Sequence, residues 1–418
     1  MKLAERPSDS WLSLLRQPGW GFRGGLAPRI RRVHRGSFLL VALVFLFPSG
    51  CKREPAELEV LDLTVYLDPP DWGYQISTEP VRIEPWSERF ICSVVRIEPQ
   101  ADELLVWVDE LESLSSDSSH HMNVFLGQFS FLDAFLEKGA FETQLGVGLG
   151  TYDCSDLGNI MEVTFPVFPS QRSNQRITMP AGVGIPLVAP LVLVMEHHYL
   201  NLRDQPALVN ASLNIQRIEP AAVEHVASLI FDDIPDILVP AGGQKIEART
   251  CALNRDVELA LVSTHNHGRG DCATLNRYSA APDAVDPAPF FVNKSWEAPP
   301  ILHFARGSFP VAAGDGIHWA CHFSDRAGED AVNDGTADGE MCVFAAVAYP
   351  APRSLQEVTE IIASGDLLSI YDLVDELLTD CDEHPEVESP WPMTENANFG
   401  EWTDSCAPWD ETESNELE

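Results

Sequence analysis

The chain has few basic residues, no Cys-x-x-Cys pair, no repeat of fixed short period and no long membrane-spanning run. Of its 418 residues, 27 are Lys or Arg and 64 are Asp or Glu, a formal net charge of −37. Such a surface repels phosphate backbones, which excludes nucleic-acid binding. Without a Cys-x-x-Cys pair, neither a zinc ribbon nor a thioredoxin motif is supported.

Turn-forming residues are abundant by contrast, with 31 prolines and 27 glycines spread along the chain. Between them lie short runs in which apolar and polar residues alternate, the pattern of half-buried strands. We expect an all-β fold built from antiparallel β-sandwiches. Pro220 is the expected hinge between two of them. Helical spacing over Leu355–Leu378 and acidic residues after 383 predict a short helical and acidic C-terminal extension, residues 353–418.

The N-terminus has the pattern of an export signal. A basic run, Arg29–Arg35, precedes the apolar stretch Phe38–Phe47, which at ten residues is too short to span a bilayer. Ser49-Gly50-Cys51 then resembles a bacterial lipobox, although Pro48 replaces the usual aliphatic residue. We expect a lipoprotein signal peptide at 1–50, a lipidated Cys51, a linker at 51–60, and a lipid anchor in the bacterial cell envelope, on the outer membrane or periplasmic face. An ordinary membrane anchor or an unprocessed leader is the alternative.

The cysteine count agrees with export. Nine cysteines are an odd number, and assigning Cys51 to lipid leaves eight, enough for four disulfides in an oxidising envelope. Free buried cysteines are the alternative. The eight are Cys92, Cys154, Cys251, Cys272, Cys321, Cys342, Cys381 and Cys406.

Most of the twelve histidines are clustered. Neighbouring residues on a regular strand point to opposite faces, so His120 and His121 reach one metal only if the backbone bends. A second pair, His197-His198, closes an apolar strand. In His265-Asn266-His267 both rings fall on one face, where imidazoles bind metal. For each pair, a solvent-exposed or structural role is the alternative.

Met341 lies in Glu340-Met341-Cys342, at the start of an apolar strand. Taken alone, such a methionine is a core residue. As a ligand, its thioether favours copper in the reduced state, because soft sulfur prefers Cu(I).

The order of these features resembles the copper type II, ascorbate-dependent monooxygenases, the family of dopamine β-hydroxylase and peptidylglycine α-hydroxylating monooxygenase. The resemblance covers roughly residues 60–352. The family's segments HHM, xPxGxGxPxG…HYxN, HxHxxG and EMC recur in order, although Val188 replaces the last glycine of the second. They occur at His120–Met122, Pro180–Asn201, His265–Gly270 and Glu340–Cys342.

The resemblance implies two copper ions per chain. Its three-histidine copper, which supplies electrons, would take His120, His121 and His198, the last chosen over His197 because it directly precedes the Tyr of HYxN. Its catalytic copper would take His265, His267 and Met341. The implied reaction is hydroxylation of a C–H bond in a small-molecule substrate, with O2 and ascorbate or another one-electron donor.

The same resemblance implies two tandem jelly-roll-type sandwiches facing a cleft, at residues 61–219 and 220–352. It implies two disulfides, Cys92–Cys154 and Cys321–Cys342. It also pairs Cys251 with either Cys381 or Cys406, and offers no counterpart for Cys272.

The substrate stays open. The peptidylglycine enzyme has an Arg and a Tyr that clamp the peptide carboxylate, and here Ser263 and Ala345 occupy those positions. Peptide amidation is therefore disfavoured. Two further function classes are a copper-binding envelope lipoprotein without turnover, and a structural or carbohydrate-binding double sandwich without copper.

Overall fold

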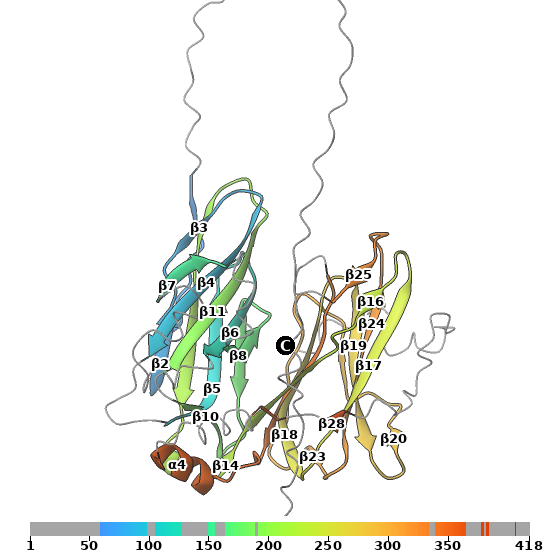
Figure 1. Ribbon diagram of the computed structural model, residues 1–418. Coiled ribbons are helices and arrows are strands. Elements are labelled where there is room, and N and C mark those ends of the chain that lie inside the picture. Colours follow the sequence, from blue (N-terminus) through green and yellow to red (C-terminus); the bar gives the residue numbers. More distant parts are fainter. Residues whose placement is uncertain are drawn as a thin grey trace, which may run out of the picture. The chain divides into compact units, whose positions relative to one another are not determined.

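The computed structural model describes residues 59–97, 105–127, 149–154, 164–188, 191–333, 339–364, 378–379, 382–383 and 406 (Figure 1). The predicted signal peptide, Cys51, Cys381 and most of the predicted acidic tail lie outside these residues. No helix in the described ranges combines the length and apolar character needed to cross a membrane.

Strands make up nearly all of the regular structure, which confirms the predicted all-β fold. The first half of the chain forms two main sheets. The first, called the β5 sheet, contains β2 (Gly73–Ser77), β5 (Leu105–Ser115), β9 (Asn174–Thr178), β10 (Val183–Val188), β13 (Ala211–Arg217) and β14 (His225–Val226). The second, called the β11 sheet, contains β4 (Ser87–Ile97), β6 (Ser119–Gly127), β7 (Gly150–Asp153), β8 (Thr164–Ser170) and β11 (Leu191–Asn201). A small third sheet contains β1 (Leu61–Asp62), β3 (Val81–Ile83) and β12 (Ala207–Val209).

The second half repeats this two-sheet arrangement. The β26 sheet contains β15 (Ser228–Asp233), β18 (Val257–Asn266), β22 (Leu302–His303), β23 (Pro310–Val311), β26 (Cys342–Tyr349) and β27 (Leu378–Thr379). The β24 sheet contains β17 (Gln244–Ala252), β19 (Gly270–Ser279), β20 (Ala284–Val285), β21 (Phe291–Asn293), β24 (Gly316–Ser324) and β28 (Asp382–Glu383). A separate ribbon pairs β16 (Leu238–Val239) with β25 (Ala331–Val332). The long pairs are antiparallel as expected, but the short pairs β1–β12, β10–β14 and β15–β27 are parallel.

Each half buries an apolar core between its two sheets, which makes it a sandwich. In the first, Val106 and Leu213 of the β5 sheet pack with Met122 and Leu193 of the β11 sheet. This cluster also includes Leu261 and other residues of the second sandwich. The second core joins the β24 and β26 sheets, and its largest fully buried side chains are Trp319, Phe323 and Phe344. Burial of alternate apolar residues on facing sheets therefore stabilises both halves.

The linking and C-terminal segments are tied to these sandwiches. A 3-10 turn, η2 (Pro220–Ala222), lies at the expected hinge. Helix α4 (Leu355–Ser364) begins with a capping box, in which Ser354 and Glu357 bond to each other's backbone N–H groups. The helical spacing over Leu355–Leu378 is confirmed for Leu355–Ser364 and is wrong at Leu378, while residues 365–377 lie outside the described residues. Leu378 belongs to β27, because it pairs in parallel with the edge strand β15.

Three disulfides join described cysteines. Cys92–Cys154 ties β4 to the end of β7, and Cys321–Cys342 ties β24 to β26, so both pairs implied by the resemblance are present. The third joins Cys272 to Cys406. Cys251 is disulfide-bonded as well. Since Cys272 takes Cys406, Cys381 stays the predicted partner of Cys251.

Candidate functional site

The first histidine cluster depends on a β-bulge. In the ladder between β6 and β11, His121 lies opposite His198, and Ser119 lies opposite the next residue, Tyr199. His120 is therefore the extra residue of the bulge. A bulge re-aims a side chain, which is how two neighbouring histidines come to lie on one side of the sheet. The ring centroids of His120 and His121 are 5.5 Å apart.

His198 completes a triangle of imidazoles. Its ring centroid lies 5.2 Å from that of His120 and 5.0 Å from that of His121. His197 points to the opposite face of β11, where its ring stacks on Tyr199 at 5.4 Å and is almost fully buried. The alternation along β11 thus brings together the three histidines that the resemblance selected, and leaves His197 apart from them.

Two residues of β4 hold the ring of His198. Its Nε2 lies 2.5 Å from Oε1 of Glu88, and its ring stacks on Phe90 at a centroid distance of 4.1 Å. Because a carboxylate only accepts hydrogen bonds, Nε2 carries the proton and the lone pair of the neutral ring lies on Nδ1. A carboxylate behind a metal-binding histidine orients the ring in this way.

Burial favours the neutral form of the three histidines in this cluster. It lowers the pKa of His120, against the opposing effect of Glu297 and Glu88. It lowers the pKa of His121 well below the usual value, and the neighbouring histidines lower it further. Burial also lowers the pKa of His198, although Glu88 acts in the opposite direction. Neutral imidazoles with available lone pairs are the form that binds a metal.

The second cluster lies on the β26 sheet. In the ladder between β18 and β26, His265 is opposite Val343 and Asn266 is opposite Cys342. His267 and Met341 each lie one residue beyond the end of their strand, and continuing this register by one residue would place them opposite each other. Since side chains alternate along a strand, His265, His267 and Met341 would then share one face. The rings of His265 and His267 are 5.1 Å apart at an interplanar angle of 82°.

The donor atoms of this pair suit a metal ion. Nδ1 of His265 is buried and has no hydrogen-bond partner within the described structure. Burial, with a contribution from His267, lowers the pKa of His265 to about 3, so the ring is neutral. Nδ1 of His267 lies 3.2 Å from the carbonyl oxygen of Gly339, which requires the proton on Nδ1 and the lone pair on Nε2. Nδ1 of His265 and Nε2 of His267 are neutral imidazole nitrogens, which copper accepts as ligands.

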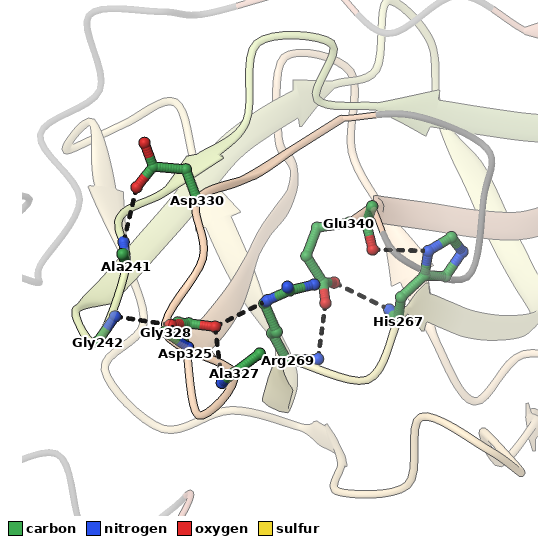
Figure 2. A network of polar contacts seen from close by, with 10 residues as sticks. Ala241, Gly242, His267, Arg269, Asp325, Ala327, Gly328, Asp330 and Glu340 are labelled. Atoms are coloured by element: carbon green, nitrogen blue, oxygen red, sulfur yellow. Dashed lines mark hydrogen bonds and ion pairs between the residues drawn. The ribbon is translucent and has the colours of Figure 1, made fainter. Parts of the chain in front are cut away.

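A buried carboxylate fixes the turn that follows His267. Figure 2 shows Glu340 accepting hydrogen bonds from the backbone N–H groups of His267, at 3.1 Å, and Arg269, at 2.6 Å. The Glu340 side chain is fully buried, and burial raises its pKa against the effect of these bonds. Glu340 therefore connects the segment that leads through Met341 into β26 to the turn of His267.

Behind this turn lies a second buried carboxylate. The guanidinium Nε of Arg269 donates to Asp325 at 3.0 Å, and Asp325 also accepts from the backbone N–H groups of Gly242, Ala327 and Gly328 (Figure 2). The hydrogen bond from Gly242, together with those from Arg269 and the other two amides, lowers the pKa of Asp325. The network anchors the turn to the β24 sheet.

Trp296 lies against His120 of the first cluster and close to Gly268, in the turn that follows His267. Its ring centroid is 5.4 Å from that of His120, and an added Cβ on Gly268 would lie 3.8 Å from the indole. A hollow of about 530 Å³ opens beside His120, with Ser118, Gln171 and Glu297 in its lining. It offers polar groups to a small ligand next to the three-histidine cluster.

Several of these residues were not foreseen from the sequence. Glu340 was noted only as part of a motif, and Glu88, Trp296 and Asp325 were not singled out. Glu88 and Asp325 are separated from the histidines they serve by long stretches of chain, so no local signal marks them.

No protein-family model and no curated protein sequence matches this chain.

Proposed function

We propose that the protein is a copper-dependent monooxygenase of the bacterial cell envelope, which hydroxylates a C–H bond of a small molecule with O2 and ascorbate or another one-electron donor. The observation that carries the proposal is the presence of two separate donor sets. One is a triangle of three imidazoles, and the other is a His-x-His pair whose strand register, continued by one residue, leads to a methionine.

The two sets differ in the chemical softness of their donor atoms, which supports a different role for the copper ion in each. Copper bound to them supplies one-electron transfer and O2 chemistry. The set of His120, His121 and His198 contains only nitrogen, which serves both oxidation states of copper. Met341 adds a soft thioether to His265 and His267, which favours the reduced ion. We assign electron supply to the first set and substrate oxidation to the second.

The chain's own residues hold each set in place. Glu88 and Phe90 fix the ring plane of His198, while Glu340 and the carbonyl of Gly339 fix the backbone and ring of His267. Ligands fixed in advance need less ordering when a metal binds.

The side chains next to the second set on its strand face are uncharged, which bears on the kind of substrate that could bind there. Ser263 and Ala345 are direct partners across β18 and β26, on the same face as His265. The Ser263 hydroxyl donates to the carbonyl of Pro300 at 2.9 Å, and Val343 is buried next to it. No cationic side chain lies in this row, so it has no anchor for a carboxylate. A small substrate without an essential carboxylate fits better than a peptide C-terminus.

Copper stoichiometry and oxygen uptake test the proposal together. The wild-type protein should hold about two coppers and consume O2 when ascorbate is added, since each set has three side chains that can bind one ion. His198→Ala should lower the copper content to about one, because one of the three imidazoles that would bind the ion is lost. His197→Ala is the matched control and should keep both ions, since its ring lies on the opposite face of β11.

The outcomes separate the three function classes. A protein that binds two coppers but shows no ascorbate-dependent O2 uptake would be a copper-binding lipoprotein without turnover. A protein that binds no copper would be a structural or carbohydrate-binding double sandwich. If His197→Ala removes a copper and His198→Ala does not, the three-histidine set is wrongly assigned.

A further inference from the structure

The outer face of the β24 sheet carries a group of metal-ligand residues that belongs to neither histidine cluster. Cys272 of β19 and His322 of β24 are direct partners across the ladder. Cys406, which is 134 residues further along the chain, is bonded to Cys272. The sulfur atoms of both cysteines and a ring nitrogen of His322 all lie within 4.8 Å of one another.

The setting of this group suits a bound ion. Cys272 is 1% exposed and His322 is 7% exposed, so both are shielded from bulk water. Burial lowers the pKa of His322 to about 4, so its imidazole is neutral at neutral pH and has a lone pair to donate. The neighbouring residues Ile246 and Ala320 form a small apolar cluster beside it. A purely structural disulfide would not need the His322 imidazole within 4.8 Å of its sulfur atoms.

We propose that Cys272, Cys406 and His322 form a thiol-dependent site for Cu(I), separate from the two sites proposed above. In the disulfide form the site is closed. A dithiol reductant gives two electrons and two protons to the Cys272–Cys406 bond, which breaks into two thiols while the reductant closes to its own disulfide. Cu(I) then displaces one proton from each thiol, and two Cu–S bonds and one Cu–N bond form.

The donor set favours Cu(I) over other ions. Thiolates are soft ligands that select Cu(I) and zinc over magnesium, calcium or manganese. Structural zinc sites close with four protein ligands. The group found among the described residues has three, two of them sulfur. Cu(I) accepts such a low coordination number, so it is the ion to which we assign the site.

The experiment compares Cu(I) binding by full-length protein before and after reduction. The protein is treated with a dithiol, separated from it under argon, and titrated with Cu(I) against a competing chromogenic chelator. Reduced wild type should hold about one more Cu(I) than the untreated protein, because one set of two thiolates and an imidazole is uncovered. His322→Asn keeps both cysteines, and should weaken this extra ion by at least roughly tenfold through loss of a ligand.

Two controls isolate the site. Reduction also opens other disulfides, among them Cys92–Cys154 and Cys321–Cys342, so Cys272→Ser/Cys406→Ser should lose the extra ion while Cys92→Ser/Cys154→Ser should retain it. His303→Asn, on the exposed strand β22, should leave it unchanged. Circular dichroism of the untreated variants checks that each one folds.

Each result decides the proposal. The site is supported if reduction adds one Cu(I), if His322→Asn binds this ion more weakly, and if both controls bind it as wild type does. No extra ion on reduction, or equal binding by wild type and His322→Asn, would overturn it. Preferential retention of Zn(II) over Cu(I) would overturn the assignment of the ion. Failure of the proposed monooxygenase function would appear instead in the copper content of the untreated protein, so the two failures are distinguishable.

Discussion

Replacing Glu340 tests whether a buried carboxylate positions the second candidate copper site. Its two oxygens accept the backbone N–H groups of His267 and Arg269, and its side chain has no exposed surface. In Glu340→Ala both donors lose their acceptor inside the protein. Glu340→Gln keeps one carbonyl oxygen for one of the two donors and turns an amide N–H₂ toward the other.

The magnitude follows from the count of these donors. A buried donor left without an acceptor costs about 1–3 kcal/mol, so Glu340→Ala should lower the free energy of unfolding by about 2–6 kcal/mol. Glu340→Gln leaves one donor unsatisfied and should cost about 1–3 kcal/mol. Domains of this kind have about 5–15 kcal/mol in total, so the alanine variant removes a large share. Because the turn also holds His267, copper affinity at this site should fall roughly 10–100-fold.

Chemical denaturation and copper titration measure the two effects separately. Glu360→Ala, on the exposed side of α4, is the matched control and should change the free energy of unfolding by less than about 0.5 kcal/mol. The three-histidine site should keep its affinity in every variant. If Glu340→Ala has the same free energy of unfolding as the control and binds two coppers with unchanged affinity, the positioning role of Glu340 is refuted.

Three further predictions address other parts of the chain. Met341→Leu should cost under about 1.5 kcal/mol of stability, because it nearly conserves volume. It should also abolish sulfur scattering from bound copper in X-ray absorption and sharply reduce ascorbate-dependent O2 uptake; unchanged scattering and turnover would exclude Met341 as a ligand. The hydrogen bonds that lower the pKa of Asp325 stabilise the fold above the carboxyl's unfolded pKa, and this stabilisation is lost as pH falls through the folded pKa. Asp325→Asn should therefore be less stable than wild type at neutral pH and lose less stability on acidification, as measured by unfolding midpoints across pH; parallel profiles would contradict this. Cys51→Ser should move the protein from the detergent phase to the aqueous phase in phase partitioning, and a variant that stays in the detergent phase would disprove lipidation.

The local parts of the candidate site were predictable from the sequence. His265 and His267 are two residues apart on a strand, so their shared face follows from alternation alone. The choice of His198 over His197 came from the resemblance, and their opposite faces follow from the same rule. The all-β fold followed from the short alternating runs and the frequent turn residues.

The non-local parts were not predictable, because they depend on pairing between distant strands. The bulge at His120 exists only once β6 is set against β11, and no feature of His120-His121 marks it. The placement of Met341 opposite His267 requires the register of β18 against β26, continued by one residue. Leu378 has helical spacing in the sequence but is in β27, because the edge of β15 offers it a backbone partner and tertiary pairing outweighs helical spacing.

Strand β11 has a consequence for how the chain finds its register during folding. Its residues Leu191–Met195 are apolar on both faces, and the doublet His197-His198 offers an imidazole to either face. A slip by one residue would therefore preserve both the apolar packing and a histidine at the cluster. Glu196 is the one charged residue of β11, and Nδ2 of Asn123, directly opposite, donates to it at 3.0 Å. In the slipped strand this carboxylate would face the apolar core, where a charge is costly. Glu196 thus disfavours the slipped register of β11, although the apolar residues and the histidine doublet would tolerate it.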